Sequence, residues 1–204
     1  MLQVTQFPHP FLGNTYLVFS ENEAFCIDMG MDYASVLRHC ESRGLTLKGI
    51  FLTHGHYDHI QGLRSYSGNV PIYIGAGDLD FLTDGHLNQS LSMFRDSLNL
   101  DFIEAIPISE MDEFTLGGEK MKVLETPFHT RGSLCFYFPE SGLLFSGDTL
   151  FRLSIGRDDL PGAMPRAKQT SLQKLITLPP DTKVHPGHMG KTTIGFEVAN
   201  NPLL

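Results

Sequence analysis

The sequence predicts a fold of the α/β class, in which β-strands and α-helices alternate along the chain. Two patterns support this prediction: short runs rich in apolar and β-branched residues, and longer segments whose apolar residues recur at helical spacing. With 204 residues, of which 41% are hydrophobic, the chain can bury a core without disulfide bonds. No low-complexity linker divides it, so we expect a single domain spanning residues 1–204.

Eight strands are expected where β-branched and aromatic residues gather. Most of these segments end in a loop that is rich in polar residues, which is where α/β folds place their chemistry. The predicted strands cover residues 15–19, 24–27, 49–53, 71–74, 120–125, 133–138, 143–146 and 182–184.

Three helices are expected among these strands, because apolar residues recur three and four positions apart. The first helix places Val36, Leu37 and Cys40 on one face, and the last places Leu172 and Leu175 on one face. The predicted helices cover residues 33–43, 59–66 and 166–176. In residues 75–102, glycine, aspartate and asparagine interrupt the apolar residues, so this segment is either a mobile flap over a pocket or a surface insertion packed on the core.

Charge and composition exclude several functions. The formal net charge of -8 gives no basic surface for a phosphate backbone, so we expect no nucleic-acid partner. No stretch approaches the ~20 apolar residues that span a bilayer, and the N-terminus has no signal-peptide pattern, so we expect no membrane association and a cytoplasmic location. The three cysteines, Cys26, Cys40 and Cys135, form no C-x-x-C pair and are interpreted as buried thiols.

Four candidate metal ligands follow the predicted strand at residues 49–53. His54, His56, Asp58 and His59 form an H-x-H-x-D-H run, which is a strong motif in a chain with nine histidines. Imidazole nitrogens with carboxylate oxygens suit zinc, manganese or iron(II) rather than calcium or magnesium. Four ligands would close one tetrahedral site, so a catalytic centre needs two ions and further ligands from elsewhere.

Three residues on glycine- or proline-marked loops supply those further ligands. His129 and Asp148 each follow a predicted strand, and His188 lies in the run H-P-G-H at residues 185–188. Each of them taken alone is also typical of an ordinary turn or loop residue. Their joint occurrence with the first cluster favours a dinuclear site.

The order and flanks of these pieces resemble the metallo-β-lactamase superfamily, and more closely its glyoxalase II (hydroxyacylglutathione hydrolase) branch. That branch carries T-H-x-H-x-D-H, G-H-T-x-G-S, G-D-T-L-F and P-G-H, and this chain has T-H-G-H-Y-D-H, F-H-T-R-G-S, G-D-T-L-F and P-G-H in the same order. The resemblance covers nearly the whole chain. It implies a four-layer αββα sandwich with the metal site at one edge of the paired sheets.

The resemblance also implies a division of the ligands between two divalent ions, most simply zinc, with iron or manganese as alternatives. One ion would be held by His54, His56 and His129, the other by Asp58, His59 and His188, and Asp148 would bridge them. Asp58 and Asp148, together with a metal-bound hydroxide, would carry the catalysis. Two divalent ions bring four positive charges, and Asp58, Asp148 and the hydroxide return three, which leaves one to stabilise a developing oxyanion.

Contacts with substrate are predicted from positions where this chain departs from the motifs of that branch, and from charged residues. Phe128 replaces the usual glycine before the ligand histidine, and Arg131 replaces a usual proline, so both are candidates for the substrate pocket, together with Arg157 as an anion contact. Asp28 is a candidate for the carboxylate that orients a ligand imidazole, because a metal-bound histidine usually donates its other N–H. A plain aspartate at a strand end is the alternative.

The leading functional hypothesis is hydrolysis of a small-molecule thioester of the hydroxyacylglutathione type. Longer members of that branch grip glutathione with a C-terminal helical domain that these 204 residues do not include, so recognition of glutathione stays open. One alternative is a sulfur (persulfide) dioxygenase with a single iron on His54, His129 and Asp148. Others are a β-lactamase and a non-enzymatic metal-binding protein with closed coordination. The sequence carries no signal for an oligomeric state.

Overall fold

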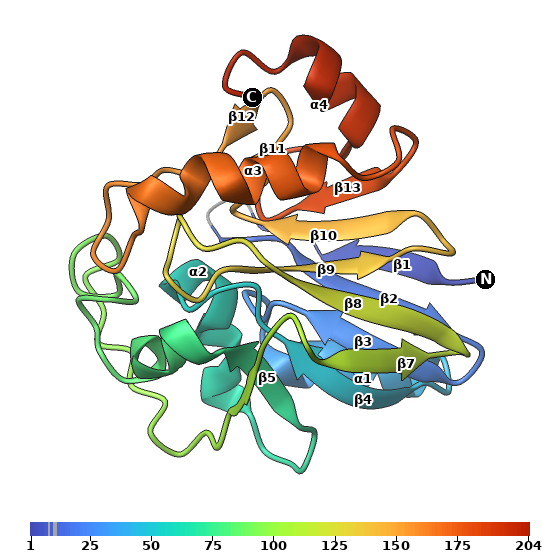
Figure 1. Cartoon of the computed structure of the whole chain (residues 1–204). Coiled ribbons are helices and arrows are strands. Elements are labelled where there is room, and N and C mark those ends of the chain that lie inside the picture. The colour runs from blue at the N-terminus through green and yellow to red at the C-terminus, as the bar shows by residue number, and fades with distance from the viewer. Residues whose placement is uncertain (8, 10–11) are drawn as a thin grey trace.

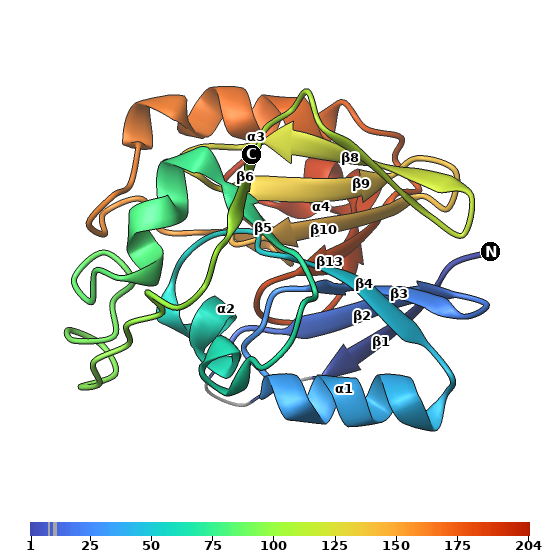
Figure 2. The ribbon, with the colours of Figure 1, turned by 90° about the horizontal axis from the view of Figure 1, so that it is seen from below.

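The computed structural model describes residues 1–7, 9 and 12–204, and its fold belongs to the α/β class. Two six-stranded sheets pack face to face, and helices cover both outer faces (Figure 1). Figure 2 displays the layers in order, with α3 (Lys168–Ile176) on one outer side and α1 (Tyr33–Ser42) on the other. The expected αββα sandwich is therefore confirmed.

The first sheet has the order β1-β2-β3-β4-β5-β6. Strands β1, β2 and β3 pair with one another in antiparallel fashion, whereas the pairs β3–β4, β4–β5 and β5–β6 are parallel and need helical connections between them. The strands are β1 (Gln3–Phe7), β2 (Thr15–Ser20), β3 (Glu23–Ile27), β4 (Thr46–Phe51), β5 (Ile72–Gly75) and β6 (Ile106–Ile108). The connections hold α1, α2 (Tyr57–Ile60), and the 3₁₀ helices η1 (Gln61–Ser65) and η2 (Ala76–Leu82).

The second sheet has the order β14-β13-β10-β9-β8-β7, with β10 and β13 parallel and the other neighbours antiparallel. Its strands are β7 (Glu113–Leu116), β8 (Glu119–Glu125), β9 (Leu134–Phe138), β10 (Leu143–Gly147), β13 (Lys183–Pro186) and β14 (Thr192–Thr193). A small ribbon, β11 (Leu150–Phe151) and β12 (Ser154–Ile155), follows β10. The outer face carries η3 (Pro165–Ala167), α3 and α4 (Ile194–Asn200).

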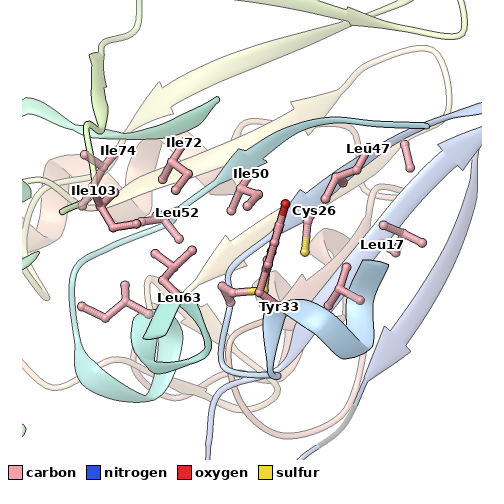
Figure 3. Packing of buried hydrophobic residues seen from close by; sticks show 14 of the residues in the cluster. Leu17, Cys26, Tyr33, Leu47, Ile50, Leu52, Leu63, Ile72, Ile74 and Ile103 are labelled. Atoms are coloured by element: carbon pink, nitrogen blue, oxygen red, sulfur yellow. The ribbon is translucent and has the colours of Figure 1, made fainter. Parts of the chain in front are cut away.

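Three separate hydrophobic clusters hold the four layers together, because the sheet residues alternate between two buried faces. In β9, for example, Phe136 packs between the sheets, whereas Cys135 and Tyr137 pack toward α3. The cluster between the first sheet and α1 includes Leu17 and Tyr33 (Figure 3). These two faces explain why the strands read as almost continuous apolar runs.

The described part of the chain agrees with two further expectations. All three cysteines are free and buried, as interpreted from the sequence. None of the helices in residues 1–7, 9 and 12–204 combines the length and the hydropathy needed to cross a bilayer.

Candidate metal centre

The seven predicted ligands come together at one edge of the stacked sheets. Four of them follow β4, and the other three follow β8, β10 and β13. Strands β8, β10 and β13 run in the same direction, because β9 is antiparallel to both β8 and β10 and β13 is parallel to β10. Their carboxyl ends therefore meet at the same edge. The residues that meet there are His54, His56, Asp58, His59, His129, Asp148 and His188.

The ligand atoms are spaced as metal coordination requires. His56 Nδ1 lies 2.9 Å from His129 Nε2, and His188 Nε2 lies 3.0 Å from Asp58 Oδ2. Asp148 Oδ2 lies between these pairs, 3.5 Å from His129 Nε2 and 3.6 Å from His188 Nε2. Ligands at about 2.0–2.1 Å around one tetrahedral ion are about 3.3 Å apart, which these distances bracket.

Two buried ligand atoms make no hydrogen bond with the described residues: Nε2 of His54 and Oδ1 of Asp148. Buried polar atoms normally have partners, so these atoms fit a cation. The ligand atoms form groups within 4.8 Å, and one group containing Asp148 overlaps the other two. The groups are His54, His56 and His129; Asp58, His59 and His188; and His54, His59 and Asp148. The residues present therefore fit the implied pair of ions.

Asp28 makes the contact that the sequence-based hypothesis assigned to it. Its Oδ2 lies 2.8 Å from Nδ1 of His59 and accepts a hydrogen bond from the Thr53 hydroxyl at 2.9 Å. Its Oδ1 accepts the backbone N–H of Thr53 at 2.7 Å. The Thr53 oxygen lies 3.1 Å from Nδ1 of His54. One carboxylate thus orients His59 directly and His54 through Thr53, and both rings turn their Nε2 atoms toward the cluster.

Electrostatics divides the cluster into neutral and charged groups. Burial lowers the pKa of His54 well below its usual value and that of His56 to about 3, so both are neutral, as metal ligands must be. Burial also disfavours a charge on His59, but nearby carboxylates, Asp28 foremost, raise its pKa well above the usual value. The charge of His59 outweighs the burial of Asp148 and holds the pKa of that carboxyl well below its usual range. A cation that binds here must therefore displace a proton from His59.

A cavity of about 440 Å³ opens above the cluster, and Arg157 lines it. The backbone carbonyl of Arg157 accepts a hydrogen bond from His129 Nδ1 at 2.7 Å, which turns Nε2 of that ring toward the ligands. The structure thus places Arg157 beside the site, as a residue of the cavity lining and through its carbonyl.

The other two predicted substrate contacts lie elsewhere. Phe128 is fully buried and does not line the cavity, because its ring is part of the interior. Arg131 also lies outside the cavity: its guanidinium pairs with Asp80 and sits 5.3 Å from the ring centre of Phe81. Both placements differ from the sequence-based expectation. A bulky residue beside a ligand in sequence need not face the substrate, because successive residues of a loop point in different directions.

Residues 75–102 are packed on the core and also border the cavity. The backbone N–H of Tyr57 donates to the Asn88 carbonyl at 2.8 Å, and the Tyr57 ring stacks on Phe94 at 4.3 Å between ring centres. Gln89, Met93 and Phe94 line the cavity. The packed-insertion interpretation therefore describes this segment, and the same packing makes it part of the cavity wall.

Asp78 is a buried carboxylate that the sequence reasoning missed. It accepts hydrogen bonds from the backbone N–H of Gly55 at 2.9 Å and of Gly132 at 2.8 Å, and from the Thr130 hydroxyl at 2.6 Å. Burial raises its pKa, against the effect of these hydrogen bonds. Asp78 thereby joins the loop that carries His54 and His56 to the loop after His129. Its position just after a predicted strand was the one available signal.

The family model described as the metallo-beta-lactamase superfamily matches residues 9–188. The chain belongs to the metallo-beta-lactamase superfamily. Within this superfamily, the chain is similar to the probable metallo-hydrolase YqgX of Bacillus subtilis (strain 168), with 34% identity over 199 residues that cover 96% of this chain and 93% of the relative. By this identity and coverage, the chain is a relative of a probable metallo-hydrolase. A hydroxyacylglutathione hydrolase of Brucella anthropi is 34% identical over 157 residues, which cover 77% of this chain and 53% of that protein.

Solved structures share the fold. The BLEG-1 B3 metallo-beta-lactamase matches with a TM-score of 0.89 and 32% identity over 99% of both chains. TTHA1623 in a di-iron-bound form matches with a TM-score of 0.82 and 35% identity, covering 97% of this chain and 98% of that one. The superfamily and its sandwich fold are established, whereas the glyoxalase II branch is not singled out by these relatives.

Proposed function

We propose that this member of the superfamily is a thioester hydrolase that works with two divalent transition-metal ions, zinc foremost. One observation carries the proposal: two groups of three ligands lie side by side, a third group that contains Asp148 overlaps both, and residues of this cluster form the floor of an open cavity. A closed structural site would have no such opening, so this arrangement favours catalysis over a non-enzymatic metal-binding role.

In this proposal His54, His56 and His129 would hold one ion, Asp58, His59 and His188 would hold the other, and Asp148 would contribute to both sites. Such ions lower the pKa of water to about 7 and polarise a carbonyl. The protein side chains position these ions, and Asp28 keeps the rings of His54 and His59 in the required orientation.

Asp58 is the residue we assign to proton transfer. Its carboxylate lines the cavity beside His188. Burial works against its charge, but His59 and His188 lower its pKa, so it is ionised at neutral pH and can accept a proton from water at the cavity floor. A thioester needs no strong acid to protonate its leaving group. A thiol has a pKa of about 8.5, so its thiolate leaves readily.

Thioesters are the proposed substrates because a hydroxyacylglutathione hydrolase is among the relatives of this chain. The decisive assay uses zinc-loaded protein and S-lactoylglutathione, together with a simple acyl thioester of a small thiol. We expect about two ions per chain, turnover that falls at least about 100-fold on chelation, and recovery on adding zinc back. Turnover that matches the metal-free protein on both substrates would end the proposal.

Ligand variants test the dinuclear arrangement independently of substrate. Asp58→Ala should reduce the metal content toward one ion per chain, whereas Asp148→Ala should weaken both sites. Metal quantification checks this, and unchanged stoichiometry in either variant contradicts the corresponding role. The sulfur dioxygenase alternative would give about one iron per chain and oxygen uptake with glutathione persulfide. The close grouping of Asp58, His59 and His188 favours two ions instead.

Hydrolysis of β-lactams is the second candidate function. The similarity to the BLEG-1 B3 metallo-beta-lactamase over 99% of the chain favours it. A water whose pKa is lowered by the ions could also attack a lactam carbonyl. A chromogenic cephalosporin added to the thioester assay separates the two, because each substrate is followed at its own wavelength.

A further inference from the structure

The walls of the cavity come from three segments that are far apart in the sequence, one of which is the loop after β13 with Met189. Gln89, Met93 and Phe94 belong to the insertion at residues 75–102, and most of the other wall residues belong to the stretch that runs from β11 to Leu160. The volume of about 440 Å³ lies in the range of pockets that enclose a small ligand. Substrate groups other than the scissile bond must therefore contact these walls.

Polar side chains in the walls already have partners within the protein. Arg157 is the one lysine or arginine that lines the cavity among the described residues, and it pairs with Asp159 through two contacts of 2.6 and 2.8 Å. Gln89 donates to the His86 carbonyl at 2.6 Å and accepts from the Ser92 hydroxyl at 2.7 Å. An anionic or strongly polar substrate group would have to displace these partners.

The remaining wall surface is apolar and preformed. Phe94 is held by its stacking on Tyr57, whose hydroxyl donates to Asp96 at 2.9 Å. Met93 and Met189 line the cavity and leave 55% and 59% of their surfaces exposed, so their apolar side chains are open to a ligand. Methionine adapts to apolar ligands of different shape. The other apolar wall residues are Phe151, Ile155 and Leu160.

We propose that this cavity selects thioesters with a medium-length apolar acyl group, such as hexanoyl, over short hydroxylated or anionic acyl groups. The proposal rests on the thioester hydrolase function proposed above. In the reaction, the carbonyl carbon forms a bond to the oxygen of water and its bond to sulfur breaks. The products are the fatty acid and the thiol, and the water supplies the proton that the sulfur takes.

The test compares three acyl groups on one thiol, N-acetylcysteamine, with zinc-loaded protein. Hexanoyl, lactoyl and glutaryl thioesters differ only in the acyl group, and glutaryl matches hexanoyl in length but ends in a carboxylate. Each methylene that leaves water for an apolar wall raises affinity about fourfold. We expect kcat/KM for hexanoyl to exceed the other two values by at least about tenfold. Equal values, or a preference for lactoyl or glutaryl, would overturn the proposal.

Wall variants show whether the preference comes from this cavity. Phe94→Ala and the more conservative surface change Met93→Ser should each lower kcat/KM for hexanoyl several-fold while changing that for lactoyl less than about twofold. Leu91→Ala is the matched control, because Leu91 is exposed in the same segment but does not line the cavity. An equal effect on both substrates, or an effect of Leu91→Ala as large as that of Phe94→Ala, contradicts the proposal.

A binding measurement separates this inference from the proposed function. Calorimetry with two uncleavable thioethers, S-hexyl- and S-(2-hydroxypropyl)-N-acetylcysteamine, measures the preference without turnover. Tighter binding of the hexyl compound, lost in Phe94→Ala, supports the apolar selectivity even if no thioester is cleaved, in which case only the proposed hydrolase function fails. Equal binding of the two compounds overturns the selectivity.

Discussion

Asp28 connects the two metal-ligand groups through hydrogen bonds alone. Its carboxylate contacts His59, which belongs to one group, and the Thr53 hydroxyl, whose oxygen faces His54 of the other group. The Thr53 hydroxyl donates to Asp28, so its oxygen is free to accept Nδ1–H of His54. The backbone of Asp28 has a φ of 58°, in the left-handed region that aspartate tolerates better than most residues. This turn aims the carboxylate at the ligands from the end of β3.

Asp28→Asn should therefore weaken metal binding at both sites. The amide cannot accept from all three donors as the carboxylate does, and loss of such an outer partner typically costs about 10–100-fold in metal affinity. Competition with a chromogenic chelator measures the two affinities. Thr53→Ser keeps the hydroxyl and serves as the control, whereas Thr53→Val should weaken chiefly the ion held by His54. Wild-type affinities in Asp28→Asn would show that Asp28 is a plain strand-end residue.

The 3₁₀ helix η2 contributes to the site although none of its residues is a candidate ligand. It follows β5, and its Asp78 accepts hydrogen bonds from the loops after β4 and β8, which belong to different sheets. Gly132 permits this approach, because a Cβ there would meet the Asp78 backbone nitrogen at 2.5 Å. The short helix therefore fixes the distance between the loops that carry His56 and His129.

Asp78→Ala should destabilise the fold and loosen this junction. It leaves the buried amides of Gly55 and Gly132 without an acceptor, at about 1–3 kcal/mol each, so we expect a loss of about 3–5 kcal/mol in the free energy of unfolding. Urea unfolding in the presence of a chelator measures it. Asp80→Ala is the control, since it removes only an exposed ion pair with Arg131 and should cost less than about 1 kcal/mol. Similar losses of unfolding free energy in the two variants would show that Asp78 does not join the two loops.

The sequence predicted the elements and ligands that have a local signal. The strands β2, β3, β9 and β10 lie where expected, because their β-branched and aromatic residues gather within a few positions. The helix expected at residues 59–66 is instead α2 followed by η1: Gly62 packs so closely on Met31 that a Cβ would overlap its carbonyl. The strand β1, only partly buried, and the role of Asp78, whose partner Thr130 is 52 residues away, had no local signal.

The packing of the two sheets also buries a histidine that is not part of the metal cluster. His185 on β13 is 4% exposed, and its ring stacks on Phe145 of the same sheet and meets Tyr16 of the other sheet edge-on. Its Nδ1 has no hydrogen-bond partner among the residues that the structure describes. Burial, with smaller effects from Lys191 and Lys183, lowers its pKa to about 4. The sandwich thus holds this imidazole in its neutral form.

This burial should make the stability of the sandwich sensitive to acid. The unfolded chain protonates His185 near pH 6.5 but the folded chain only near pH 4, so between these values the unfolded state binds more protons and stability falls as the pH falls. His185→Phe keeps the ring packing and removes the proton site. As the pH falls from 7.5 to 5, the free energy of unfolding of the variant should rise by about 2 kcal/mol relative to that of the wild type. Urea unfolding with a chelator present measures this difference. Because the metal ligands are the same in both proteins, their titration cancels in the comparison. A difference between the two proteins that stays constant across this range would mean that His185 is as easily protonated in the folded chain as in the unfolded one.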